Sequence, residues 1–269
     1  MSAVAKRVHI VGCPRSGTTL MLGLIASCFE VDGACELEMS LHREPERPCA
    51  VFVSKKPTDV RILAPILRAD PDLFAVYLVR DPRAVISSLH PGFPGRWFVT
   101  LSAWHECERH ARALAGEPRF VTVRYEDLVA DPDGVQDALA VALPFLRRRH
   151  RFSEFARVAA VSADAARVMH GVRAVSADRV DGWRAHLARI RAQEIVHGGL
   201  GPALVERGYE RDEAWLAALA GVEPDFGPSR FADREPVWKV LDRRWRDWWR
   251  TRRTLRRVRA RVRAESAAR

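Results

Sequence analysis

Hydrophobic and polar positions alternate along the chain in blocks, which is typical of a parallel sheet covered by helices. Short apolar runs predict strands near residues 7–12, 49–53, 73–80 and 119–124. Apolar positions at helical spacing predict helices over residues 18–29, 59–68, 83–89, 97–115, 134–142, 153–170 and 183–206. A short turn is expected at 128–131 and a loop at 173–182. The fold class is therefore α/β.

The stretch from Arg7 to Ile25 places an apolar strand, a glycine turn and an apolar helix in succession. In such a unit, backbone N–H groups of the turn and the positive end of the helix dipole face one point, which suits a phosphate. Gly12 and Gly17 have the spacing of a P-loop. This unit predicts a P-loop-type three-layer α/β/α fold with a central, mainly parallel sheet.

The turn departs from the P-loop formula at one position. Thr19 fits the last place of the formula, but Thr18 stands where a lysine should reach the β- and γ-phosphates. A cation is found earlier in the turn, at Arg15. The missing lysine counts against an ordinary nucleotide kinase or ATPase.

A second motif, RDPRAVISS, follows the third predicted strand. Arg80 ends the strand and Ser88 lies eight residues later, so a guanidinium fork and a hydroxyl are available for a lone phosphate. Two alternatives stay open. Asp81 has the position of a magnesium-binding carboxylate, or it forms a helix-capping ion pair with Arg80 without any ligand.

These motifs together resemble those of sulfotransferases that use 3′-phosphoadenosine-5′-phosphosulfate (PAPS), in particular bacterial members and the tyrosylprotein and carbohydrate branches. The string PRSGTT resembles their 5′-phosphosulfate loop, and Arg80 with Ser88 matches their 3′-phosphate site. The segment YEDL from Tyr125 resembles theirs after the fourth strand, and the segment 171–184 resembles a looser G-x-W-R motif. The motifs keep the family's order over most of residues 7–210.

The resemblance implies a nucleotide site and a metal-independent reaction. The 5′-phosphate would be held by Ser16, Gly17, Thr18 and Thr19, with Arg15 as the cation of the loop. Tyr125 would lie near the adenine or the phosphate, although it is equally expected as a core residue. Arg173 or Arg179 would close over the nucleotide, unless both are ordinary surface arginines. PAPS is the expected co-substrate and no metal is expected.

The reaction also needs a second cation and a base. Lys55 resembles the lysine near the sulfonate, with Lys56 as its alternative and a solvated strand end as the competing interpretation. Glu36 lies at the family's distance from the loop and is the expected base, with Glu38 as runner-up. His42 and His90 are the candidate bases if the chain follows a branch of the family that uses a histidine.

Composition limits the partners and the compartment. The 269 residues carry a formal net charge of +10, which suits an anionic ligand but does not choose its class. Five scattered cysteines without a C-x-x-C pair indicate reduced thiols, and no signal peptide or membrane span is expected. We therefore expect a cytoplasmic protein, with attachment at the membrane surface as an option. The acceptor hydroxyl is left open among small molecules, carbohydrates, lipids and peptides.

Residues 1–221 are expected to form the catalytic domain, 222–236 a proline- and glycine-rich linker, and 237–269 a basic helical tail. In the tail, Trp238, Leu241, Trp245, Trp248, Leu255 and Val262 recur at helical spacing and predict one apolar stripe. This amphipathic helix would dock on its own domain or a partner helix, or lie on an anionic membrane. Nucleic acid is not an expected partner.

Two alternatives to a sulfotransferase remain at this point. One is a P-loop nucleotide kinase, against which Thr18 counts. The other is a non-catalytic module that binds a nucleotide or a membrane. The presence of Arg15, Lys55 and Glu36 favours an enzyme over such a module.

Overall fold

The computed structural model describes residues 4–90, 92–159, 161–169, 171–178 and 180–267. Its centre is an all-parallel sheet in the order β2-β3-β1-β4-β5. The strands are β1 Val4–Gly12, β2 Gly33–Ala34, β3 Cys49–Lys55, β4 Leu73–Val79 and β5 Phe120–Arg124. The four predicted strands are confirmed, and the two-residue β2 is an addition that its length hid from the pattern.

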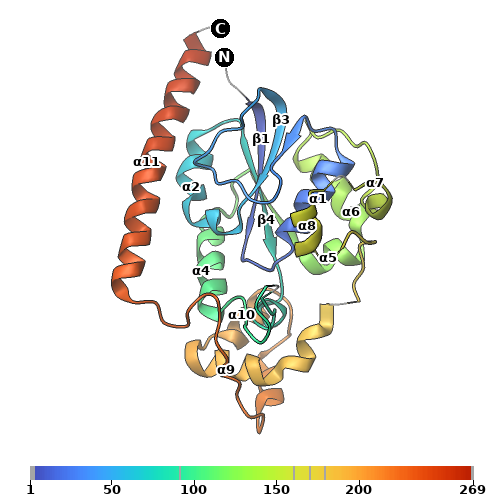
Figure 1. Cartoon of the computed structure of the whole chain (residues 1–269), viewed down its shortest axis with the longest axis vertical. Helices are drawn as coiled ribbons and strands as arrows, with labels where there is room; N and C mark the ends of the chain where they lie inside the picture. Colours follow the sequence, from blue (N-terminus) through green and yellow to red (C-terminus); the bar gives the residue numbers. More distant parts are fainter. Residues whose placement is uncertain (1–3, 91, 160, 170, 179, 268–269) are drawn as a thin grey trace.

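Helices cover both faces of this sheet, as the α/β prediction required (Figure 1). They are α1 Thr18–Cys28, α2 Val60–Ala69, α3 Pro82–Ile86, α4 Leu101–Arg112, α5 Tyr125–Ala130, α6 Pro132–Ala142, α7 Phe155–Val158, α8 Ala163–Val168, α9 Leu187–His197, α10 Leu200–Glu206 and α11 Val237–Ala267. Short 3-10 segments lie at Pro57–Asp59, Phe152–Glu154, Val180–His186 and Glu213–Leu219. The α/β/α prediction with a C-terminal basic helix is confirmed.

Two helix predictions and one turn prediction were wrong in detail. The expected helix 153–170 is broken into α7 and α8, because Ser162 starts a new helix by accepting from the Ala165 N–H at 3.1 Å. The expected turn at 128–131 is largely helical, since α5 begins with Glu126 and Asp127 in its first turn, where carboxylates favour the dipole. The expected helix 183–206 is interrupted at Gly198 and Gly199.

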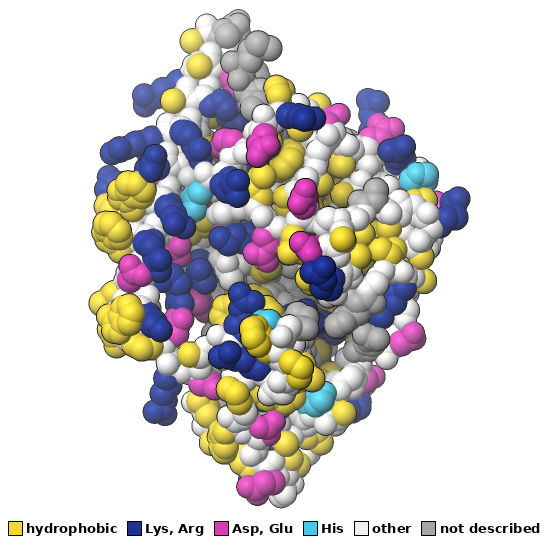
Figure 2. Space-filling view, in the orientation of Figure 1, with side chains coloured by type: hydrophobic (Ala, Val, Ile, Leu, Met, Phe, Trp, Pro, Cys, Tyr) yellow, Lys and Arg dark blue, Asp and Glu magenta, His cyan; other side chains and the backbone are white. Residues whose placement is uncertain are grey.

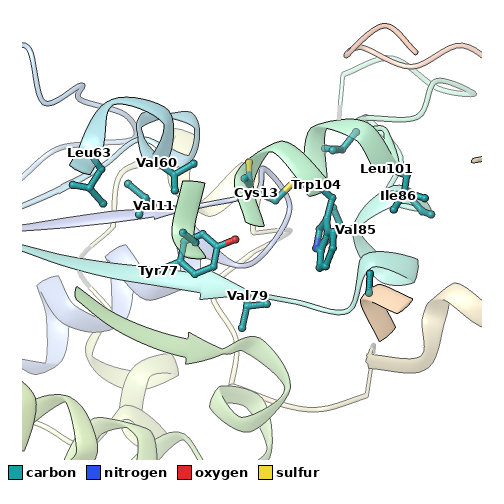
Figure 3. Close-up of a cluster of buried hydrophobic side chains, with 14 of the residues drawn as sticks. Val11, Cys13, Val60, Leu63, Tyr77, Val79, Val85, Ile86, Leu101 and Trp104 are labelled. Carbon is teal, nitrogen blue, oxygen red and sulfur yellow. The ribbon is translucent and has the colours of Figure 1, made fainter. Parts of the chain in front are cut away.

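The sheet separates two hydrophobic cores. Successive residues of β4 point to opposite faces, so Tyr77 and Val79 enter the core beneath α2 and α4, while Val76 and Leu78 enter the core beneath α1. Figure 3 shows the first core, where Tyr77 lies among side chains from several elements. Because the sheet is buried on both faces, it fixes the positions of the strand ends at which the polar motifs begin.

The tail helix α11 packs along α2 (Figure 1). Its buried residues are Thr251, Thr254 and Val258, and Arg61 of α2 pairs with Asp247 at 3.5 Å. The expected single apolar stripe is therefore divided: Leu255 packs against the core, whereas the tryptophans nearer the start of the helix are exposed. Within the described part of the chain, we find no helix with the length and apolar character that a bilayer crossing requires.

Candidate functional site

The loop after β1 has a backbone that depends on glycine. Gly17 has φ 95° and caps α1, and Arg15 also lies in the left-handed region at φ 75°. A Cβ added to Gly17 would lie 2.5 Å from the Cδ2 of Tyr125. The turn thus packs directly on the Tyr125 ring, which brings two sequence motifs 108 positions apart in the chain into contact.

Two parallel strands deliver the arginines to one place. Because β1 and β4 are neighbours, with Gly12 paired to Leu78, their carboxyl ends meet at the same edge. Arg80 donates from Nη1 to the Arg15 carbonyl at 3.0 Å, and Arg15 donates from Nε to the Ser88 Oγ at 2.7 Å. The Arg80 guanidinium also lies 4.1 Å from the Tyr125 ring centroid. Arg15, Arg80, Ser88 and Tyr125 form one cluster, called here the arginine junction.

The arginine junction is positively charged, and not all of its hydrogen-bonding groups have a partner among the described residues. Burial, and then the charge of Arg80, lower the pKa of Arg15. Among the described residues, the Ser16 Oγ and the Arg80 Nε are buried without a hydrogen-bond partner. The Ser16 N–H already donates to the Cys13 carbonyl at 3.0 Å, so the hydroxyl is the donor of Ser16 that is available to a ligand. Buried donors at a helix N-terminus fit an anion with several oxygens, such as a phosphate.

A cavity of about 910 Å³ opens above the junction. Seven of the eight residues predicted to bind the nucleotide line it, namely Arg15, Gly17, Thr18, Thr19, Arg80, Ser88 and Tyr125; the eighth, Ser16, is buried and does not. Lys55, at the end of β3, also lines it and is only 3% exposed in its side chain. Burial lowers the pKa of Lys55, and the Glu38 carboxylate 3.3 Å away opposes that shift. A volume of this size accommodates a nucleotide together with a second small ligand.

The two candidate bases differ in position. Glu38 lines the cavity, with its side chain 49% exposed and paired with Lys55. Glu36 is exposed and is not part of the cavity wall; its carbonyl accepts a hydrogen bond from Ser162 at 3.0 Å. The structure thus brings Glu38, and not Glu36, beside the cation.

The remaining candidates are distributed around the rim and beyond. His42 lies away from the cavity wall and contacts Thr254 of α11 at 2.9 Å. Lys56 lies 3.9 Å from Asp59, outside the cavity. Arg173 lines the cavity, whereas Arg179 falls outside the described residues.

Asp81 is occupied by a neighbouring arginine. Its carboxylate accepts from the Arg83 backbone at 2.8 Å and from the Arg83 guanidinium at 2.7 Å, so it caps α3. The alternative in which Asp81 forms a cap pair with Arg80 is therefore wrong in its partner, because Arg80 turns toward Arg15. Across the residues that the structure describes, no group of three or more His, Cys, Asp or Glu side chains gathers in the manner of a metal site.

The rim of the cavity holds a cluster that the motifs did not predict. Residues 222–236, called here the strap, run beside Trp97: the Trp97 N–H donates to the Pro228 carbonyl at 3.0 Å, and the Arg230 N–H donates to the Trp97 carbonyl at 2.9 Å. This pairing places the Arg230 guanidinium 5.2 Å from the Phe98 ring and 3.2 Å from the His90 Nε2. The composition of the strap is that of a linker, and it does not predict this contact.

Phe98 is the centre of this rim cluster. The His90 ring stacks on it at 5.0 Å, and the Arg15 guanidinium lies 5.6 Å from its centroid on the side of the junction. Burial, then the charges of Arg230, Arg96 and Arg15, lower the pKa of His90. The rim therefore presents arginine charge against aromatic surface.

Comparison with known proteins shows which family part of the chain resembles. Residues 39–144 match the model of the sulfotransferase family. The matched range contains Lys55, Arg80, Ser88 and Tyr125 but begins after the Arg15 loop, so the PRSGTT string is a separate observation. This match confirms the resemblance to sulfotransferases that the ordered motifs indicated. None of the curated proteins matches the chain.

Several solved structures are similar in outline. The sulfotransferase domain of the Synechococcus PCC 7002 olefin synthase is 17% identical, with 67% of this chain and 87% of that domain covered and a TM-score of 0.45. The sulfotransferase domain from the curacin biosynthetic pathway is 16% identical, with 68% and 92% covered and a TM-score of 0.47. A mouse sulfotransferase complexed with PAP is 16% identical, with 80% and 83% covered and a TM-score of 0.39.

Proposed function

We propose that this chain is a sulfotransferase and transfers a sulfuryl group from PAPS to an acceptor hydroxyl. The arginine junction carries the proposal. Two arginines, a serine hydroxyl and a helix N-terminus meet where adjacent parallel strands end, and the Ser16 hydroxyl and Arg80 Nε are buried without a protein partner among the described residues. A nucleotide with one phosphate at each end of its ribose would satisfy both groups of donors.

The chemistry of each side chain indicates which part of the nucleotide it would bind. The Thr18 and Thr19 hydroxyls line the cavity and, with the first amides of α1 and the buried Ser16 hydroxyl, would hold the 5′-phosphate. Arg80 and Ser88 also line the cavity and would hold the 3′-phosphate. Tyr125 supports both the loop and Arg80, so it would position the site rather than react.

The transfer itself needs a base and a cation at the reacting oxygens. The acceptor oxygen forms a new S–O bond, the bond from sulfur to the 5′-phosphate oxygen breaks, and the leaving phosphate takes the electron pair. We assign Glu38 as the base that takes the acceptor's proton, because it lines the cavity beside Lys55. Lys55 and Arg15 would stabilise the charge that develops on the leaving oxygen.

The rim cluster indicates the class of acceptor. Arg230 and Arg15 flank Phe98, so an acceptor that carries a carboxylate or phosphate in addition to its hydroxyl would be held there by charge-assisted hydrogen bonds. Apolar wall residues such as Phe155, Trp183 and Met169 would contact its carbon skeleton.

The test is a titration followed by an acceptor screen. We expect 3′-phosphoadenosine-5′-phosphate (PAP) to bind by calorimetry without added metal, and Arg80→Ala to weaken it by more than about tenfold, since a charged partner is lost. Sulfur-labelled PAPS should then label hydroxyl acceptors in a mixed library. Failure of PAP to bind the folded chain, or equal binding by adenosine, would reject the proposal.

A further inference from the structure

The side of α11 that faces away from α2 is apolar in its first half. Its exposed residues are Trp238 at 64%, Leu241 at 57%, Trp245 at 62%, Trp248 at 53% and Trp249 at 45%, and together they are called here the tryptophan face. Figure 2 shows hydrophobic side chains along the edge of the molecule where Figure 1 places α11. Four exposed indoles on one helix form an unusual patch for a surface that contacts only water.

The arrangement follows from helical spacing. Along the sequence, the five residues are separated by intervals of three, four, three and one, which keeps them on one side of the helix. The opposite side holds Thr251, Thr254 and Val258, which are buried against the domain. The packing of α11 on α2 therefore uses a different face and leaves the indoles outward.

Positive charge surrounds these indoles. The helix contains twelve Arg or Lys and three Asp or Glu, a formal net charge of +9, whereas the whole chain carries +10. Arg252 lies 4.7 Å from the Trp248 ring and Arg253 lies 4.6 Å from the Trp249 ring. Nearly all of the net charge of the protein is thus presented by the element that exposes its tryptophans.

We propose that the tryptophan face binds the surface of an anionic lipid bilayer, with α11 lying parallel to the membrane plane. Tryptophan favours the boundary between headgroups and acyl chains, and flanking arginines extend to lipid phosphates while their stems cover apolar surface. A duplex nucleic acid would use the arginines but would leave a face of five apolar side chains in water. The bilayer satisfies the indoles and the charges together.

The experiment uses the full chain and two kinds of vesicle, one of phosphatidylcholine alone and one with 30% phosphatidylglycerol, sedimented at about 0.1 M salt. We expect binding to the anionic vesicles and little to the neutral ones. Trp245→Ala with Trp248→Ala should weaken binding by more than about tenfold, since two indoles no longer enter the interface. Arg252→Gln and Arg253→Gln should each weaken it by about fivefold.

Matched controls separate this face from general hydrophobicity. Val141→Ala and Ile195→Ala remove exposed apolar side chains at 82% and 58% and should leave vesicle binding unchanged. A second pair, Trp238→Ala with Leu241→Ala, repeats the test at the other end of the face, and thermal melts verify that all variants fold.

Several results would overturn the proposal. They are absence of binding to anionic vesicles, equal binding by the tryptophan variants, or tryptophan-dependent binding of an oligonucleotide without vesicle binding. Conversion of a dimer to a monomer by the tryptophan variants, again without vesicle binding, would assign the face to a second copy of the chain. Because the readout is lipid binding, none of these results bears on sulfuryl transfer.

Discussion

At the scale of single residues, the choice between two glutamates decides how the proposed reaction works. We expect Glu38→Gln to lower kcat by about 10²–10⁴, the range for a missing general base, while PAP affinity measured by calorimetry stays the same. Glu36→Gln is the matched control, because Glu36 is exposed and outside the cavity wall. A turnover loss in the Glu36 variant with a normal Glu38 variant would return the role to Glu36.

Lys55 gives the reaction a pH dependence of known sign. Burial lowers its pKa from the ordinary value of 10.5, so the side chain loses its proton as pH rises, before an exposed lysine would. Activity that needs the cation should therefore fall at alkaline pH, with a midpoint below 10.5 in the profile of kcat/KM.

Arginine substitution tests this assignment. Lys55→Arg keeps the charge across the accessible range, so the alkaline limb should move to higher pH even if turnover is reduced. Lys56→Arg is the control, since Lys56 lies outside the cavity wall, and it should leave the profile in place. An alkaline limb that persists unchanged in the Lys55 variant would show that another group titrates there.

At the scale of elements, the turn between β1 and α1 is fixed by its contact with α5. Gly17→Ala would place a methyl group 2.5 Å from the Tyr125 ring at a φ of 95°, so the loop or the ring must move. We expect a loss of PAP affinity together with a stability loss of about 1–3 kcal/mol in denaturant unfolding.

A second glycine separates the two causes. Gly116 also has a positive φ, at 80°, but an added Cβ there would meet nothing within 4 Å. Gly116→Ala should therefore cost only the conformational strain, of about 1 kcal/mol, and leave PAP affinity intact. Equal losses of stability in the two variants would mean that the contact with Tyr125 is unimportant.

The strap is the element that we expect to select the acceptor. Arg230→Ala should raise KM for a hydroxyl acceptor with a carboxylate, while KM for its uncharged amide and the affinity for PAP stay constant, because Arg230 lies at the rim and not in the arginine junction. Arg234→Ala, in the same strap but outside the cavity wall, is the control. A parallel loss of PAP affinity would assign Arg230 to the nucleotide.

The sequence predicted features that depend on neighbouring residues, and it did not predict contacts between segments that are distant in the chain. The sequence identifies Arg15 and Arg80 because each follows a strand in a local motif, and Ser88 because it lies eight residues after Arg80. Parallel pairing alone brings the strand ends together. The sequence favours Glu36 over Glu38 because Glu36 lies at the family's distance from the PRSGTT loop, whereas the orientation of the segment after α1 depends on contacts with Ser162 and Lys55. Such contacts between distant segments leave no periodic pattern in one sequence.

Residue patterns also left the contacts of the C-terminal part unpredicted. The strap reads as a linker from its prolines and glycines, yet it pairs with Trp97 through backbone bonds that any sequence could make. In α11, Thr251 and Thr254 are buried in place of the tryptophans. This follows from the surface of α2 and from His42, whose ring forms a hydrogen bond with the Thr254 hydroxyl at 2.9 Å. Helical spacing predicted the helix but not which side would be covered.

At the scale of the whole molecule, the C-terminal part divides into two segments with separate proposed roles. The strap supplies Arg230 to the cavity, and α11 supplies the tryptophan face on the far side of its contact with α2. A chain that stops after Pro236 should therefore keep PAP affinity and acceptor preference in solution but lose binding to anionic vesicles. Its melting temperature should fall, since the contacts of Thr254, Leu255 and Val258 are removed.

A chain that stops after Gly221 provides the comparison. It lacks the strap as well, so it should lose both vesicle binding and the preference for a charged acceptor, while PAP still binds at the arginine junction. The two truncations, measured by vesicle sedimentation, PAP calorimetry and KM for the paired acceptors, separate the segments. If the chain that ends at Pro236 loses the acceptor preference to the same extent, α11 and the strap act as one unit, because the strap then needs the docked helix to stay against Trp97.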